Sequence, residues 1–204
     1  MRKLILLIVF NATFLLSKAQ ICGTPGLDGS SNLTGSGSIN TYYPISGNIT
    51  LAAGSRSISL TAVPFDDVYG NNFGTKPISA GDMLLVIQMQ DATINATNDV
   101  LYGSGNANAG PDNLGGTGFT NLGNTGVFEY VIATNSVPMT GGTLTFRAAG
   151  NNKGTVNSYF SALETATRGK RTFQVVRIPQ YSNLVLSSSI KTPPFNGDVG
   201  GIYI

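Results

Sequence analysis

The sequence predicts an all-β fold: an antiparallel, sandwich-like domain with long Gly/Asn-rich loops, preceded by an N-terminal signal helix. Three observations predict it. Short segments alternate apolar and polar residues, glycine, asparagine and proline are frequent between them, and no clear helical periodicity follows residue 19. We expect about eight to ten short strands from this spacing. A β-solenoid that starts near the end of the chain is an equal alternative there.

Residues 1–19 have the three regions of a cleaved secretory signal peptide. A positive start is followed by an apolar stretch, and small residues precede a cut after Ala19. The uninterrupted apolar run is shorter than the roughly 20 residues that a membrane-spanning helix needs. Cys22 lies near the cut, but Gln20 and Ile21 do not fit a lipoprotein site. We therefore expect a secreted protein that reaches the extracellular cell surface.

The charge of the mature chain argues against nucleic-acid binding. The precursor has a net charge of +2, but removing Arg2, Lys3 and Lys18 leaves nine basic residues against ten acidic ones. Such a balance provides no basic field for phosphates. About 185 mature residues are enough for one domain, and 41% of the chain is apolar. The single cysteine, Cys22, excludes an internal disulfide.

The first half of the chain predicts an irregular entry followed by strands. Residues 20–46 are rich in glycine and serine, so we expect an irregular entry segment there. We expect the β-rich domain to span residues 47–190. Its first two strands, at 49–52 and 58–63, alternate apolar with small polar residues around a turn at 54–55.

The strongest predicted element is a central strand at 83–90. It is apolar on both faces in its first half and alternates in its second half, and a buried helix is the competing interpretation. Residues 126–133 and 142–148 predict a strand–turn–strand pair. A further short strand is expected at 155–160, and 161–167 is a candidate for a helical turn.

The last part of the chain predicts two more strand regions and an interrupted third. Residues 172–178 alternate clearly and are followed by Pro179, which ends the strand. A strand region at 184–190 follows. Residues 191–204 begin a further β element that stops inside an apolar strand at Ile204. We therefore expect the chain to be a fragment of a longer protein.

The sequence lacks the residues on which most enzyme chemistry depends. It contains no histidine and one cysteine, which removes Ser-His-Asp and Cys-His pairs, the commonest general base and ordinary zinc sites. No glycine-rich phosphate loop with its lysine is present. We predict no catalytic, cofactor-binding or metal-binding residue, and a chain that is not an enzyme.

Calcium is the one cofactor that the carboxylates allow. Ca²⁺ binds oxygen ligands, but no acidic residue here has EF-hand spacing, so we expect solvated loop aspartates with calcium as the alternative. A glycosidase pair is not specific among ten acidic residues. The calcium candidates are Asp66, Asp67, Asp91, Asp99 and Asp112.

The first candidate for a recognition surface is the segment 91–125. It carries no periodicity and is too long for an ordinary loop of a compact domain. An insertion without a ligand is the alternative, and it is favoured over a recognition role. The only basic cluster, at 168–171, is expected to be a solvated turn. Several tyrosines are candidates for stacking on sugars, although core and strand positions are favoured for them: Tyr42, Tyr43, Tyr69, Tyr102, Tyr181 and Tyr203.

Three segments, 80–90, 173–181 and 194–202, resemble the N-terminal region of large secreted cell-surface proteins of Bacteroidetes and some myxobacteria. The resemblance covers most of residues 45–204. It implies an adhesin-like region that precedes a Gly-rich, repetitive extracellular body. Bacteroidetes members of this family often end in a gliding-motility or type IX secretion sorting domain. The resemblance carries over no functional residues.

Together these observations predict a non-catalytic structural or adhesive module of a secreted bacterial cell-surface protein. Its partners would be a glycan or protein ligand on an extracellular surface and the downstream domains of the same protein. We expect no nucleic-acid partner and no membrane span in the mature chain. The alternative is an accessory, carbohydrate-binding domain of a secreted polysaccharide-degrading enzyme whose catalytic part lies beyond Ile204.

Overall fold

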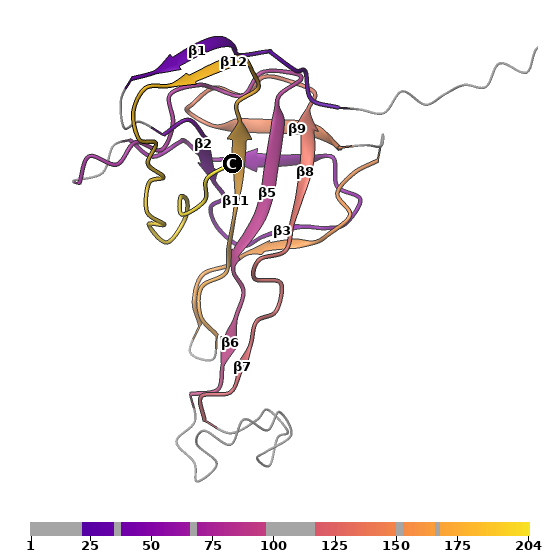
Figure 1. The fold of residues 1–204 in the computed structure, drawn as a ribbon. Helices are drawn as coiled ribbons and strands as arrows, with labels where there is room; N and C mark the ends of the chain where they lie inside the picture. Colours follow the sequence, from indigo (N-terminus) through magenta and orange to yellow (C-terminus); the bar gives the residue numbers. More distant parts are fainter. Residues whose placement is uncertain (1–21, 35–37, 66–68, 97–116, 150–152, 166–167) are drawn as a thin grey trace, which may run out of the picture.

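A computed structural model gives the structure of the protein. All of its described residues belong to an all-β fold with twelve strands and no helix, which confirms the predicted class (Figure 1). The candidate helical turn at 161–167 is therefore wrong over 161–165, and the expected signal helix lies outside the described residues. No helix long and apolar enough to cross a membrane occurs in the part described. The structure describes residues 22–34, 38–65, 69–96, 117–149, 153–165 and 168–204.

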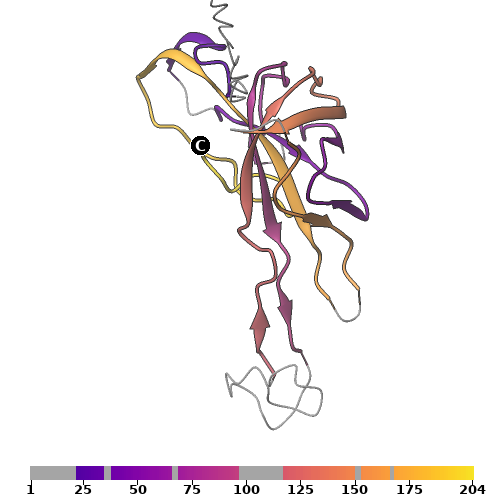
Figure 2. The same cartoon turned by 90° about the vertical axis from the view of Figure 1, so that its right-hand side faces the viewer.

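A curled antiparallel sheet of six strands forms the body of the molecule (Figure 2). The two strands with the clearest sequence patterns lie side by side near its middle, since they are the most apolar. In order across the sheet, the strands are β2 (Thr41–Pro44), β11 (Thr172–Ile178), β5 (Met83–Gln90), β8 (Phe128–Ala133), β9 (Gly142–Ala148) and β4 (Ser57–Leu60). The finer expectations of a sandwich and a solenoid are not confirmed.

Six further strands form three two-stranded sheets. β3 (Ile49–Leu51) pairs with β10 (Tyr159–Ser161), and β6 (Thr93–Ile94) pairs with β7 (Thr120–Asn121), both antiparallel. β1 (Gly29–Leu33) and β12 (Tyr181–Leu186) are parallel. The strands predicted at 49–52 and 58–63 exist but do not pair with each other, because β4 lies beside β9 instead.

Both faces of the central sheet are covered at β11, which is buried at every position. On one face, Phe173 and Val175 contribute to the main core. On the other face, the irregular segment 190–204 lies against the sheet and is held by Gln174, whose side-chain amide exchanges two 2.9 Å hydrogen bonds with the backbone of Gly200. The Tyr42 hydroxyl also donates to the backbone oxygen of Ile202.

Two predictions about the ends of the domain are corrected by this packing. Residues 197–204 are not a strand, because Gly200 and Gly201 have φ of 95° and 75°, which break an extended path. The segment 20–46 is not irregular throughout, since it contains β1 and the sheet strand β2. In β2, which pairs with β11, the adjacent residues Tyr42 and Tyr43 are both fully buried.

Candidate functional site

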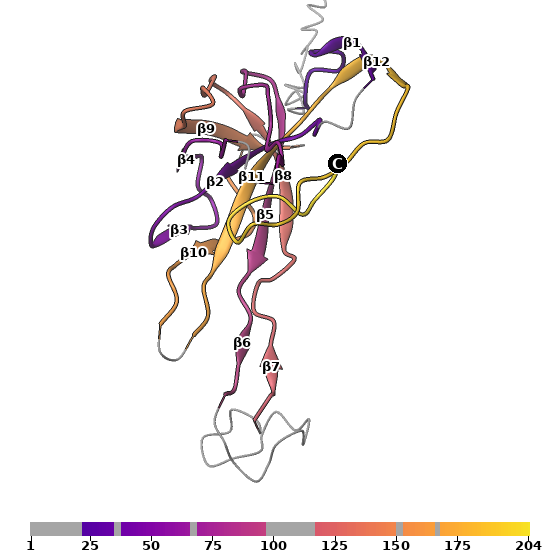
Figure 3. The ribbon, with the colours of Figure 1, turned by 90° about the vertical axis from the view of Figure 1, so that its left-hand side faces the viewer.

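An arm formed by β6 and β7 projects from one end of the body (Figures 1 and 3). Its pairing continues beyond the two short strands, since Asn95 N–H donates to the Phe119 oxygen at 2.9 Å and Gly118 N–H to the Asn95 oxygen at 2.7 Å. The described residues of the arm, 91–96 and 117–125, belong to the segment 91–125, which is the first candidate for a recognition surface. Residues 97–116, between its two sides, lie outside the described residues.

Asp91 fixes the base of the arm. Its backbone N–H donates to Thr125 Oγ1 at 2.9 Å, and its Oδ2 accepts from Asn124 N–H at 2.8 Å, so both sides of the arm are tied together there. Gly123, at φ 56°, passes so close that a Cβ atom would lie 2.8 Å from the Asp91 carboxylate. This close approach explains why a glycine stands at that position.

Two arginines from another part of the chain bind the same carboxylate. Arg168 Nη2 donates to Asp91 Oδ1 at 2.6 Å and to the Asp91 backbone oxygen at 3.0 Å, and Arg171 Nε also donates to Oδ1. Burial alone would raise the pKa of Asp91, but these hydrogen bonds and the positive charge of Arg171 outweigh it and lower the pKa. The expected solvated basic turn at 168–171 is thus an ion-paired anchor of the arm.

The loop between β10 and β11 forms a second, shorter projection beside the arm (Figures 2 and 3). Bridges between Ala162 and Arg171 and between Thr165 and Arg168 shape it, and the Arg171 guanidinium lies 4.0 Å from the centre of the Phe160 ring. Lys170 pairs with Asp198 at 2.7 Å. We call the two projections together the distal end: the described residues of 91–125 and 162–171.

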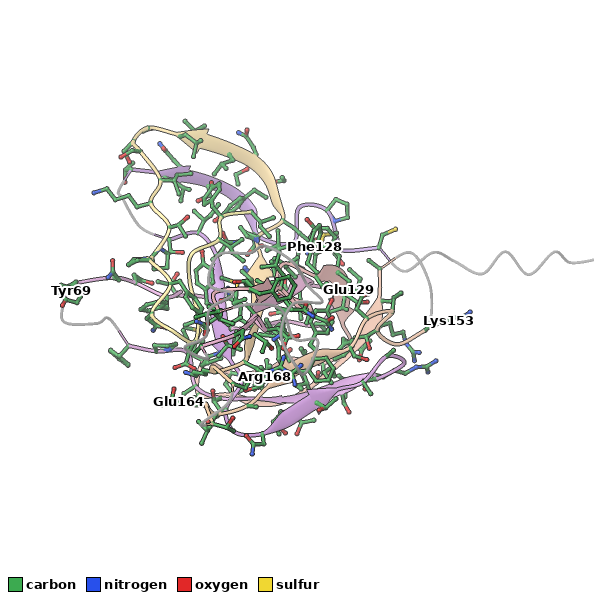
Figure 4. All side chains as sticks on the ribbon, turned by 90° about the horizontal axis from the view of Figure 1, so that it is seen from below. Tyr69, Phe128, Glu129, Lys153, Glu164 and Arg168 are labelled. Atoms are coloured by element: carbon green, nitrogen blue, oxygen red, sulfur yellow. The ribbon has the colours of Figure 1, made fainter. Side chains whose placement is uncertain are left out.

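Apolar side chains are exposed at the distal end. They are Ile94 on β6, Leu122 after β7 and Leu163 on the second loop, with exposed fractions of 60%, 63% and 67%. Figure 4 views the molecule from this end, with Glu164 and Arg168 of the second loop labelled and with Tyr69 and Lys153 at opposite sides of the picture. Each of these apolar side chains is exposed on a projecting part of the molecule, a kind of position that often carries binding residues.

The calcium candidates do not form a site among the described residues. Asp91 is occupied by two arginines, and no group of three or more His, Cys, Asp or Glu side chains that could hold a metal occurs in the described part of the chain. The other candidates, Asp66, Asp67, Asp99 and Asp112, lie outside the described residues.

The candidate tyrosines do not share one location. Tyr42 and Tyr43 are core residues. The Lys76 ammonium lies over the Tyr181 ring, 5.7 Å from the ring centre. Tyr69 and Tyr203 are exposed but come from separate segments, before β5 and at the end of the chain. Tyr102 lies outside the described residues.

Sequence reasoning missed a buried ion-pair cluster at the other end of the body. Arg177 Nε and Nη2 donate to the two oxygens of Asp82 at 2.7 and 3.0 Å, and Nη2 also donates to Asp28 Oδ1 at 2.8 Å. Asp28 accepts from Lys76 and from the Gln180 backbone as well. One signal was visible in advance: Arg177 shares a strand face with Phe173 and Val175, and a buried arginine needs a carboxylate.

Glu129 is a second carboxylate that sequence reasoning passed over. It accepts hydrogen bonds from the backbone N–H groups of Val156 and Asn157 at 2.8 and 2.9 Å, and from the Tyr159 hydroxyl at 3.1 Å. Burial and the negative charge of Glu129 raise the pKa of Tyr159. These bonds hold the segment before β10 against β8, which is a structural role.

A scan against family models, a search of curated proteins and a search of solved structures each found no match for the chain.

Proposed function

We propose that this chain is a non-catalytic adhesive or structural module of a secreted bacterial cell-surface protein, and that it contacts its ligand with the distal end. The observation that carries the proposal is the arm, because it projects from the body, exposes apolar side chains and is fixed at its base by Asp91. An anchored projection presents a recognition surface without the loss of conformational entropy that a free loop suffers when binding orders it.

The carboxylates with the most internal partners have a structural role and not a catalytic one in this proposal. Asp28 and Asp82 bind Arg177, Asp91 binds Arg168 and Arg171, and Glu129 binds backbone N–H groups. A general acid or base needs a proton to exchange with a substrate, whereas these groups are committed to internal partners.

Export through a cleaved signal peptide and membership of the Bacteroidetes surface-protein family belong to the same proposal. The support is the three-part leader in residues 1–19 and the resemblance of the segments 80–90, 173–181 and 194–202. Expression of the whole chain in a bacterial host tests the export. We expect an exported protein whose N-terminal residue is Gln20, and retention of residues 1–19 would contradict it.

Binding by the distal end is tested on purified protein with two probes, an array of neutral and acidic oligosaccharides and a layer of immobilised bacterial cells. We expect retention on at least one probe. Leu122→Lys should lower the apparent affinity by about tenfold or more, since it places a desolvated charge in an apolar contact.

Val156→Lys is the matched control, because Val156 is exposed to 70% and lies on the body outside the distal end. We expect it to bind like the unchanged protein. Equal loss in both variants, or no retention on either probe, contradicts the proposal. Retention on oligosaccharides alone would identify the ligand class as carbohydrate, and retention on cells alone would favour another surface component.

A further inference from the structure

The parallel ribbon of β1 and β12 lies at the end of the molecule opposite the arm (Figure 1). Its root is firmly held. Asp28, directly before β1, accepts from Arg177 at 2.8 Å and from Gln180 N–H at 2.7 Å, and its own N–H donates to the Gln180 oxygen at 3.0 Å. The ribbon is therefore an anchored feature, although it stands apart from the central sheet.

Among the described residues no strand pairs with the second edge of β12, which we call its free edge, and this edge lacks the usual protection of an edge strand. Neither β1 nor β12 contains a charged residue or a proline, and these are the devices by which edge strands avoid pairing with other chains. Among the described residues, β1 is the only strand paired with β12. Leu184, Val185 and Leu186 are all exposed, so the edge carries apolar side chains on both faces.

The direction of the peptide groups shows which residues are open to a partner. Ser187 N–H donates to the Leu33 oxygen at 3.0 Å. Because peptide groups alternate in direction along a strand, those of Val185, two residues earlier, also point toward β1. The peptide groups of Leu184 and Leu186 then point to the free edge, where they can form hydrogen bonds with an added strand.

We propose that β12 pairs antiparallel with β12 of a second copy of this chain, with the twofold axis at Val185. In this register Val185 faces Val185, and Leu184 faces Leu186 on both sides of the axis. The two Leu184–Leu186 positions are those whose peptide groups point outward, so they become the hydrogen-bonded pairs. All three central cross-strand pairs are apolar, which favours the sheet.

A second copy suits this edge better than a charged partner does. The edge is uncharged, so two copies approach without like-charge repulsion, and the same patch serves both subunits in a twofold interface. The product is a four-stranded sheet in the order β1–β12–β12–β1. Two strands alone are marginally stable in water, whereas three or more with an apolar face are sufficient.

Charge substitution at the axis tests the pairing, with the mass of the purified protein followed by sedimentation as its concentration is raised. We expect the unchanged protein to form dimers. Val185→Lys and Val185→Glu should each remain monomeric, because a twofold axis places two like charges directly opposite each other. An equimolar mixture of the two variants should dimerise again, since lysine then faces glutamate.

The mixture separates pairing from damage to the fold, since a misfolded variant would not be rescued by its opposite charge. Val156→Lys, at a similarly exposed position on the body, should dimerise like the unchanged protein. In a Cys22→Ser background, Val185→Cys should form a disulfide-linked dimer, because directly opposite residues lie within disulfide range. A protein that stays monomeric at every concentration, or dimers that survive Val185→Lys, would overturn the proposal.

Discussion

Arg177 carries a full positive charge inside a strand whose seven residues are all buried. Burial alone would lower the pKa of its guanidinium, but Asp82 and Asp28 outweigh that effect and raise the pKa. Its Nε and Nη2 atoms donate to Asp82 and Asp28, whereas its Nη1 atom is buried without a hydrogen-bond partner in the described part of the structure. Removing either the arginine or a carboxylate from such a buried ion pair is costly, because the remaining charge is then buried without a partner.

Replacing Arg177 by alanine should therefore be severe. The change leaves the fully buried Asp82 without its partner, and we expect a loss of about 3–5 kcal/mol in the free energy of unfolding. Arg177→Lys should lose less, because lysine keeps the charge but cannot form the two-pronged contact with Asp82. Urea unfolding of the three proteins measures both losses. Equal stability of the alanine variant and the unchanged protein would show that the cluster is not structural.

Asp91 makes the stability of the folded protein depend on pH in the acid range. Because its pKa is lowered in the folded protein, its stabilising effect is present above the unfolded value of about 3.9 and is lost as the pH falls through the folded value. Asp91→Asn should cost about 1.5–3 kcal/mol near neutral pH, as expected for hydrogen bonds to charged groups. The gap in unfolding free energy between the variant and the unchanged protein should begin to narrow as the pH falls below about 4, because Asp91 then binds a proton in the unfolded chain while it stays ionised in the folded protein. The gap should be smallest below the lowered folded pKa, where Asp91 is neutral in both states.

Urea midpoints at neutral pH and at several values below pH 4 measure that gap. The pKa of Asp28 is also lowered, so its contribution to stability falls with pH in the same way in the variant and in the unchanged protein. The comparison therefore isolates Asp91. A gap that stays constant with pH would contradict the role of its charge.

At the scale of elements, the segment 190–204 depends on single side chains of the sheet. Gln174 forms both of its Gly200 hydrogen bonds from a fully buried position, and Asn40 Nδ2 donates to the Ile204 oxygen at 3.1 Å. A Cβ atom on Gly200 would lie 2.5 Å from the Pro194 oxygen, so the turn of this segment is closely packed. The segment is held by these specific bonds and by the packing of Val199, Ile202 and Ile204 against the core, without strand pairing.

Gln174→Met should loosen this segment and leave the sheet intact. The variant preserves the volume of the side chain but leaves the Gly200 N–H and oxygen unpaired, at a cost of about 1–3 kcal/mol. Amide hydrogen exchange should speed up at Gly200 by a large factor and stay unchanged at Val175. Gln88→Met is the matched control, because the buried Gln88 amide binds Phe160 and Thr172 instead. Gln88→Met should speed up amide hydrogen exchange at Phe160 and leave it unchanged at Gly200.

The sequence allowed single strands to be predicted but not their partners. Periodicity located 83–90 and 172–178 because these strands are long and strongly apolar, which is a local property. The pairing of β3 with β10 joins residues about 110 positions apart, and β4 pairs with β9 although β3 and β4 are neighbours in the sequence. Residues 197–204 misled the prediction because their apolar residues cover the sheet without joining it.

For the candidate site too, local sequence features could be predicted but long-range contacts could not. The missing periodicity of 91–125 marked the arm, and strand β6 and its partner were too short to be seen. The contact of Asp91 with Arg168 and Arg171 spans 77 and 80 positions and follows from the fold. A basic cluster in a turn is usually solvated, so composition alone favoured the wrong environment for it.

At the scale of the whole molecule, the distal end and the β1–β12 ribbon lie at opposite ends of the body (Figure 1). They are anchored by separate ion-pair clusters, around Asp91 and around Asp28. Substitutions at distant sites with no shared partner usually add within about 0.3–0.5 kcal/mol. Binding by one end and association through the other should therefore be independent of each other.

A double variant tests this independence. Leu122→Lys should weaken binding by the same factor in the unchanged protein and in the Val185→Lys variant, and Val185→Lys should abolish dimers equally with or without Leu122→Lys. The binding is compared at low density of the immobilised probe, because at high density a dimer binds with both distal ends and raises the apparent affinity without any new contact. A Val185→Lys effect that persists at low density would show that the ribbon and the distal end communicate through the sheet.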